Sequence, residues 1–208
     1  MTKTIGLAVA LAMTLATGVV AQGTNALRLT LGPSSKIWIE GTSTVRKFSC
    51  STGDFEATAR PVPEPTAPLA TAVHTVDVDV PVKSLSCGNG TMEEHLRKAL
   101  KADANPEIRF ELKSYTVGEK TAAGTDVKAT GVMTIAGTPK TVEVTGVVTP
   151  TATGLRVQGE TPLRMTDFGV KPPHLFFGML KVRDLVRVAF DFVLRGPTLT
   201  LLRHGRTR

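Results

Sequence analysis

Apolar and polar side chains alternate with a period of two along most of the chain after residue 36. Ile37 and Ile39, for example, alternate with Trp38 and Glu40. Because successive side chains of a strand point to opposite faces, such a stretch predicts a half-buried β-strand. Many of these strands at short spacing predict an all-β, antiparallel sandwich or barrel. The clearest alternating stretches are residues 37–42, 76–80, 108–114, 140–148 and 185–194.

One segment breaks the alternation and predicts a single helix over residues 91–101. Thr91 precedes Glu94 by three positions, which is the spacing of a capping box at a helix start. A helix across one end of a closed sheet would act as a plug or lid. Its apolar face would consist of Met92, Leu96, Ala99 and Leu100.

Glycine and proline mark the connections between the predicted strands. Residues 137–139, Gly-Thr-Pro, predict a hairpin loop, and Thr153-Gly154 separates the next pair of strands. The proline-dense stretch 60–68 cannot be a central strand, because proline donates no ladder hydrogen bond. We find neither a repeat nor a second domain, and we expect one domain over residues 27–195.

The first 21 residues are predicted to be a signal peptide rather than part of the fold. Lys3 precedes an apolar run from Ile5 to Val20, and small or short residues precede a cleavage site after Ala21. An uncleaved membrane anchor is the alternative, although the run is somewhat short for a spanning helix. Cleavage predicts that the protein is periplasmic or secreted.

The positive net charge of +7 is concentrated near the C-terminus. Without Lys3 and the four arginines at 195, 203, 206 and 208, the chain has 20 basic against 18 acidic residues. We expect residues 196–208 to be a disordered basic tail, although such a tail could also touch anionic lipid. The sequence has no basic stripe with interleaved aromatic residues, so it does not indicate nucleic-acid binding.

The two cysteines, Cys50 and Cys87, are expected to form a disulfide, since export permits one. Two separate buried thiols are the alternative. Bridging them would close a long loop and stabilise the fold by roughly 4 kcal/mol.

Reactive motifs are missing from the sequence. The histidines at 74, 95, 174 and 204 lack metal-ligand spacing, and there is neither a nucleophile elbow nor a phosphate-binding loop. Asp77 and Asp79 share one strand face, which is best interpreted as a solvated outer face. We therefore expect no catalytic residue, metal or cofactor.

Four segments, in order, resemble the YceI-like family of periplasmic, lipocalin-like barrels. They are "SKIWIEGTSTVRKFSC", "MEEHLRKALKADANPEIRFELKSY", "ATGVMTIAGTPKTVEV" and "LRMTDFGVKPPHLFFGMLKVRDLVRVAFDF". Together they span roughly residues 36–194. The chain departs from the family in having Gly41-Thr42-Ser43 where His-Ser is usual, in its two cysteines, and in its aromatic stretch after the proline pair.

The resemblance implies an extended antiparallel barrel of about eight strands with a tunnel-like cavity. It also implies a bound polyisoprenoid or similar amphiphile, such as an isoprenoid quinone, and no catalysis. A structural or adhesive envelope domain with a filled core is the alternative, and transient contact with a membrane surface is left open. From apolarity we predict these cavity-wall residues: Ile37, Ile39, Phe48, Val76, Val78, Met92, Leu96, Phe110, Leu112, Met133, Ile135, Leu163, Phe168, Phe176, Phe177, Met179, Val188, Phe190 and Phe192.

The segment "PPHLFFGML", residues 172–180, allows three interpretations: a cavity mouth, ordinary core, or a loop inserted in a membrane. Its two prolines force an extended connection without ladder hydrogen bonds. A soluble exported barrel already accounts for apolar residues, which disfavours insertion. We predict a cavity mouth with Phe176, Phe177 and Met179 turned inward, and core packing as the second interpretation.

Overall fold

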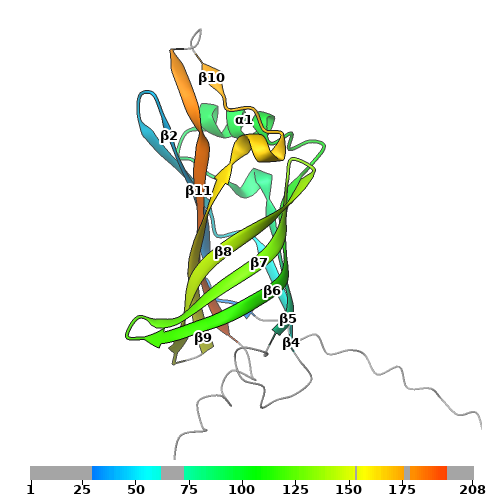
Figure 1. The fold of residues 1–208 in the computed structure, drawn as a ribbon. Coiled ribbons are helices and arrows are strands. Elements are labelled where there is room, and N and C mark those ends of the chain that lie inside the picture. Colours follow the sequence, from blue (N-terminus) through cyan, green and yellow to red (C-terminus); the bar gives the residue numbers. More distant parts are fainter. Residues whose placement is uncertain (1–29, 62–72, 153, 176–178, 196–208) are drawn as a thin grey trace, which may run out of the picture.

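The computed structural model describes residues 30–61, 73–152, 154–175 and 179–195. The predicted signal peptide, the basic tail, Phe176 and Phe177 lie outside these residues. The described part is mostly strand, with one α-helix and two short 3-10 helices (Figure 1). The elements are β1 (Thr30–Leu31), β2 (Lys36–Ser43), β3 (Lys47–Thr52), β4 (Glu56–Pro61), β5 (Val73–Pro81), η2 (Val82–Ser84), α1 (Gly90–Ala99), β6 (Glu107–Thr121), β7 (Gly124–Ile135), β8 (Thr138–Thr151), β9 (Gly154–Arg164), η3 (Met165–Phe168), β10 (His174–Leu175) and β11 (Leu180–Arg195).

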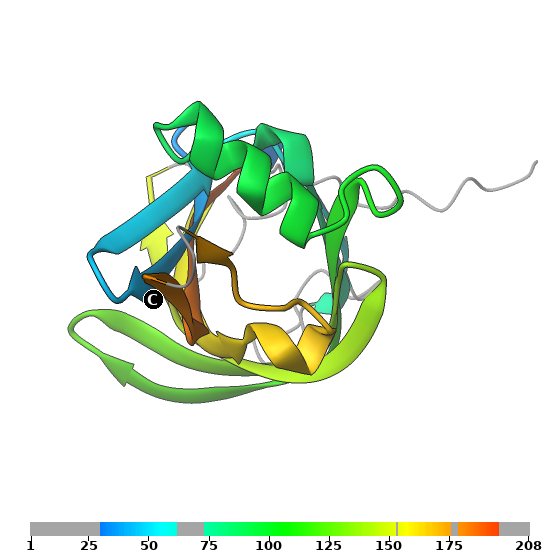
Figure 2. The same ribbon diagram turned by 90° about the horizontal axis from the view of Figure 1, so that it is seen from above.

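The strands form one antiparallel sheet in the order β3-β2-β11-β9-β8-β7-β6-β5-β4, and β1 and β10 each pair with β11. The sheet curls around one face into a barrel-like wall, and α1 and η3 lie at the same end (Figures 1 and 2). This confirms the predicted all-β antiparallel fold with one short helix. The main path has nine strands rather than about eight.

The curled sheet has a seam between β3 and β4, because these two strands stand at opposite ends of the strand order and do not pair with each other. Ser51 of β3 instead forms a bridge with Ser86, in which each backbone N–H donates to the other residue's carbonyl at 2.8 and 2.9 Å. The predicted disulfide between Cys50 and Cys87 is present beside this bridge. The segment before α1 is therefore attached to β3.

The helix begins earlier than the capping-box pattern predicts. Asn89, not Thr91, is the N-cap, and its side-chain oxygen accepts from the N–H of Met92 at 3.0 Å. Glu93 rather than Glu94 reaches back to the segment before the helix, since its carboxylate accepts a hydrogen bond from the N–H of Cys87 at 2.9 Å. The helix ends at Ala99, because the chain turns away at residue 101 with a positive φ of 53°.

The hairpin between β7 and β8 is also tighter than predicted. Its loop is Ala136-Gly137, both with positive φ, whereas Thr138 and Pro139 already belong to β8. Two such residues are what a two-residue hairpin turn requires. Gly137 meets that requirement without a steric penalty, so the connection needs no third residue.

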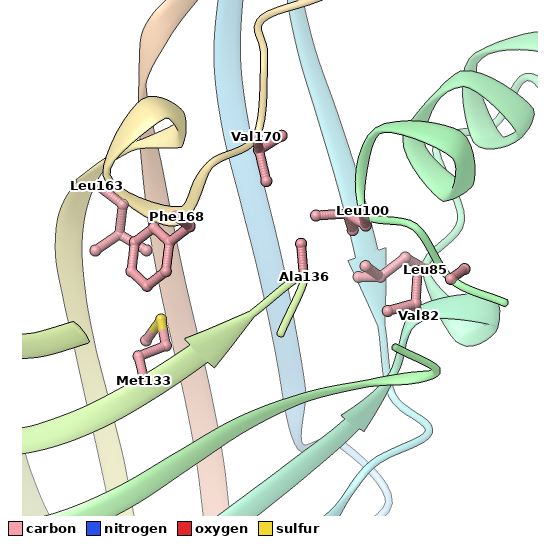
Figure 3. Close-up of a cluster of buried hydrophobic side chains, with 9 residues drawn as sticks. Val82, Leu85, Leu100, Met133, Ala136, Leu163, Phe168 and Val170 are labelled. Atoms are coloured by element: carbon pink, nitrogen blue, oxygen red, sulfur yellow. The ribbon is translucent and has the colours of Figure 1, made fainter. Parts of the chain in front are cut away.

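Two hydrophobic clusters fill parts of the interior. The first lies toward α1 and η3 and includes Val82, Leu85, Leu100, Phe168 and Val170 (Figure 3). The second consists of Ile37, Phe55, Val78 and Val80, with partly buried side chains around it. Ile108, Phe110 and Val188 pack against both clusters, so the two are continuous along the barrel.

Candidate functional site

A partly enclosed cavity of about 370 Å³ lies between α1, η3 and the inner faces of the strands. Apolar side chains on the inward face of β11 form one wall, and Ile39 stands directly opposite Val188 in the neighbouring strand. The lining is Ile39, Ser43, Arg46, Phe48, Cys50, Asn89, Thr91, Met92, His95, Leu96, Ala99, Leu100, Ile108, Ile135, Leu163, Arg164, Met165, Phe168, Val170, Pro173, Leu180, Val182, Val186 and Val188.

Helix α1 covers the cavity with its apolar face. Met92, Leu96 and Ala99 are spaced three and four positions apart, so all three side chains reach the cavity from one side of the helix. The other side carries Lys98, which pairs with Glu94 at 2.6 Å and whose side chain is 72 % exposed. The helix thus separates the cavity from solvent, as the sequence predicts.

Polar side chains enter the lining at few places. Ser43 and Arg46 come from the β2–β3 connection, Asn89 and His95 from the start of α1 and its first turns, and Arg164 from the end of β9. Arg164 and Arg46 are exposed, so they mark where the cavity meets solvent. An apolar interior with a few polar groups at its rim is the usual composition of a site for a small amphiphilic molecule.

A carboxylate fixes η3 beside the cavity. Asp184 of β11 accepts from the backbone N–H of Thr166 at 2.9 Å and from its hydroxyl at 2.8 Å. These two hydrogen bonds hold the pKa of Asp184 below its usual range. The 3-10 helix then ends at Gly169, whose φ of 66° is left-handed. Phe168 and Val170, on either side of that glycine, are therefore directed into the interior, where both are buried.

Aromatic rings pack against one another in the second hydrophobic cluster, around Ile37 and Phe55. The ring centroids of Phe55 and Phe192 lie 5.2 Å apart, and those of Phe190 and Phe192 lie 4.7 Å apart. Gly159 makes room for the Phe190 ring, since a Cβ there would lie 2.6 Å from it. Gly131 does the same for Phe110 at 2.4 Å. Large rings thus occupy the interior where a continuous tunnel would have to run.

The predicted wall residues divide between the cavity and the packed interior. Those that line the cavity are Ile39, Phe48, Met92, Leu96, Ile135, Leu163, Phe168 and Val188. Those that are buried or partly buried elsewhere, outside the cavity lining, are Ile37, Val76, Val78, Phe110, Leu112, Met133, Phe190 and Phe192.

The prediction that Met179 turns inward is wrong. Its side chain is 75 % exposed, immediately before the start of β11. The cavity mouth is nevertheless formed partly by the same segment, since Pro173 and Leu180 line it. Phe176 and Phe177 lie outside the described residues, so their inward orientation stays a prediction.

Sequence reasoning missed several lining residues. Val182 and Val186 share the inward face with Val188. Val186 lies within the predicted alternating stretch 185–194, and extending that stretch toward the start of β11 would also have identified Val182. Met165 and Val170 belong to η3 and the segment after it, where no alternation exists to reveal an inward side chain.

A larger but more open hollow of about 730 Å³ lies on the outer face of the sheet. Trp38, Thr145, Gln158 and Glu160 line it, and these positions alternate with the inward-facing ones. We favour the smaller cavity as the functional site because it is more apolar and is covered by α1, whereas the outer hollow is more polar and more open.

Within the described residues, no group of three or more histidine, cysteine, aspartate or glutamate side chains is placed to hold a metal ion. In the same part of the chain, no helix has the length and apolarity needed to cross a membrane.

Comparison with known proteins places this geometry in a family. The model of the YceI-like domain matches residues 33–194. Among solved structures, BcnA of Burkholderia cenocepacia superposes with a TM-score of 0.63 at 19 % identity, over 78 % of this chain and 98 % of that one. None of the curated proteins matches the chain.

Two further solved structures share the fold. A polyisoprenoid-binding domain from Saccharophagus degradans, implicated in plant cell wall breakdown, has a TM-score of 0.59 at 13 % identity, over 82 % of this chain and 99 % of that one. The YceI protein of Campylobacter jejuni has a TM-score of 0.54 at 18 % identity, over 70 % of this chain and 84 % of that one.

Proposed function

Because the chain belongs to the YceI-like domain family, we propose that it binds a polyisoprenoid or a similar amphiphile in the cavity beneath α1. The observation that carries this proposal is the composition of the cavity. Its interior is formed by aliphatic, methionine and aromatic side chains, and polar groups enter only near solvent. An isoprenoid quinone is an example of a ligand with these properties.

The geometry suggests how such a ligand would be oriented. The apolar chain would lie against Ile39, Leu163 and Val188, and the polar head would lie near Arg46 and His95. Each buried methylene contributes about 0.8 kcal/mol before ordering costs. At about 370 Å³ the cavity is at the low end of the roughly 300–1,000 Å³ of small-molecule sites, so we expect it to enclose only part of a long chain.

The proposed role is carriage in the cell envelope without catalysis. Branched apolar walls suffice to hold an isoprenoid chain, and no reactive group is needed for it. We place the protein in the periplasm or outside the cell, on the basis of the predicted signal peptide. N-terminal sequencing of exported protein should begin at Gln22. A sequence that begins at Met1 would contradict this location.

A structural or adhesive envelope domain is the second candidate. The aromatic packing of Phe55, Phe190 and Phe192 favours it, since these rings pack against one another in the second hydrophobic cluster. This candidate needs no ligand, and it predicts that purified protein carries none.

Organic extraction of protein purified from a quinone-producing bacterium, followed by mass spectrometry, separates the two candidates. We expect an isoprenoid lipid from the unmodified chain. The variant Leu96→Trp should carry much less, because the indole would fill the cavity. Its control is Lys98→Trp on the exposed side of the same helix, which should retain the lipid. Recovery of no lipid from the unmodified chain would overturn the proposal.

A further inference from the structure

Two connections beside the cavity mouth carry exposed apolar side chains. Val45, between β2 and β3, is 71 % exposed, and Met179, between β10 and β11, is 75 % exposed. Leu185 is the one other large hydrophobic side chain in the described residues with comparable exposure, at 56 %. Since exposed side chains of this kind are few, their pairing at one end of the barrel calls for an explanation.

The two connections form one surface. The hydroxyl of Thr44 donates to the carbonyl of Met179 at 2.9 Å, and the N–H of Thr44 donates to the carbonyl of Lys181 at 3.0 Å. The N–H of Lys181 in turn donates to the Thr44 hydroxyl at 3.2 Å. These bonds join segments 135 or more positions apart in sequence. We call residues 44–47 and 179–183 the two-tip surface.

The β2–β3 tip is also held internally. The hydroxyl of Ser43 accepts from the N–H groups of Val45 and Arg46 at 3.2 and 3.1 Å, and donates to the carbonyl of Arg46 at 2.9 Å. The exposed position of Val45 is therefore fixed by the turn.

The two-tip surface is strongly basic. Arg46, Lys47, Lys181 and Arg183 are all exposed, and within the described part of the chain none of them forms an ion pair. Residues 41–53 and 168–183 contain no aspartate or glutamate. The adjacent Asp184 is occupied by Thr166. Four cations beside two exposed apolar side chains thus face solvent, and within the described residues no carboxylate pairs with any of the four.

We propose that the two-tip surface docks onto the headgroup region of an anionic lipid bilayer. Val45 and Met179 would insert shallowly among the headgroups, and the four basic side chains would contact lipid phosphates. A bilayer fits better than a protein partner, because Val45 and Met179 are exposed beside four unpaired cations and neither side chain lines a groove. An anionic lipid surface deforms around such side chains and supplies negative charge everywhere.

Docking in this orientation would bring the cavity against the membrane. Ser43, Arg46, Leu180 and Val182 belong to or adjoin the two-tip surface, and all four line the cavity. A ligand could then pass between bilayer and cavity without crossing water. This part of the inference rests on the proposed function, whereas the binding of vesicles does not.

Vesicle co-sedimentation of the whole chain after removal of the predicted signal peptide tests whether the two-tip surface binds lipid. We expect binding to vesicles of phosphatidylcholine with phosphatidylglycerol, and much weaker binding to phosphatidylcholine alone. The pair Lys47→Gln and Lys181→Gln should weaken binding to the anionic vesicles by about 25-fold, from about fivefold per basic residue. The pair Val45→Ser and Met179→Ser should weaken binding to the same vesicles, and added salt should not restore it.

Leu185→Ser is the matched control, since Leu185 is exposed on the outer wall about 20 Å along β11 from Met179. It should bind vesicles like the unmodified chain. Thermal unfolding by circular dichroism checks that every variant is folded. Equal binding by the unmodified chain and the Val45→Ser, Met179→Ser variant would refute docking by the tips. If vesicle binding is equal and the unmodified chain still yields lipid on extraction, docking fails while the cavity proposal stands.

Discussion

Cys50 of β3 and Cys87, two residues before the N-cap of α1, are joined by a disulfide with their Cα atoms 4.0 Å apart. Cys50 is 3 % exposed and lines the cavity. The bond therefore links the edge of the sheet to the start of the helix that covers the cavity. Beside it, the Ser51–Ser86 bridge is a short backbone connection across the same seam.

Replacing both cysteines by serine should lower the free energy of unfolding by about 4 kcal/mol, on the chain-entropy model for a loop spanning 37 positions. Urea denaturation in oxidising buffer measures the difference. With a reducing agent present, the unmodified chain should lose most of this advantage. Equal stability in oxidising buffer would show that the bridge does not form in the purified protein.

Gly159→Ala should be destabilising. The added Cβ would lie 2.5 Å from the carbonyl oxygen of Thr145 and 2.6 Å from the Phe190 ring, so backbone or ring must move. We expect a loss of about 1–3 kcal/mol, the usual cost of overpacking. Gly90→Ala in α1 is the control, because a Cβ there meets nothing within 4 Å. That variant should gain about 0.4–1 kcal/mol of stability. Thermal unfolding should therefore show a lower melting temperature for Gly159→Ala and a higher one for Gly90→Ala.

Asn89→Ala should destabilise the protein by about 1 kcal/mol, because it removes the side chain that caps α1. Thr91→Ala should change the stability little, since Asn89 rather than Thr91 accepts the hydrogen bond from Met92. Chemical denaturation distinguishes the two. A larger loss of stability from Thr91→Ala than from Asn89→Ala would instead support the capping box that the sequence pattern predicts.

Asp191→Asn and Asp79→Asn should shift stability in opposite directions at neutral pH. Hydrogen bonds from Arg156, one of them 2.8 Å long, lower the pKa of Asp191. A lowered folded-state pKa stabilises above the unfolded-state value, and this contribution is lost as the pH falls through the folded-state pKa. Desolvation raises the pKa of Asp79 despite Arg109 at 3.2 Å. Its cost is therefore present at neutral pH and disappears as the pH falls toward the unfolded-state value.

We accordingly expect Asp191→Asn to destabilise and Asp79→Asn to stabilise at about pH 7, each by less than about 1 kcal/mol because both groups are partly exposed. Near pH 3 the two differences should shrink. Denaturation curves at several pH values would reveal the contrast, and parallel shifts of both variants would contradict it.

The alternation of apolar side chains was sufficient to predict β2, β5, β6, β8 and β11 and their inward faces. It could not show whether the interior is full. Val188 and Phe190 lie on the same face of β11, yet Val188 lines the cavity and Phe190 packs against the second hydrophobic cluster without lining it. What separates them is Phe55, which reaches the interior from the connection between β3 and β4 and stacks against Phe192.

Other features depend on contacts between distant segments. Met179 is exposed immediately before the start of β11. Thr44, which lies far earlier in the sequence, holds Met179 there by a hydrogen bond to its carbonyl. The helix start depends on Asn89, although Thr91 is also a residue type that can cap a helix. The disulfide and Glu93 together fix the chain before the helix, and this decides that Asn89 rather than Thr91 caps it.

The place of β11 between β2 and β9 governs when the chain can fold. The last long strand is central in the sheet, and its Arg187 contacts Glu40, which lies 147 positions earlier. A nascent chain released only as far as residue 179 lacks the strand that joins the two halves of the sheet. Contacts of such long sequence separation form slowly, because a large loop must close first. Acquisition of the native structure must therefore wait until β11 has been synthesised.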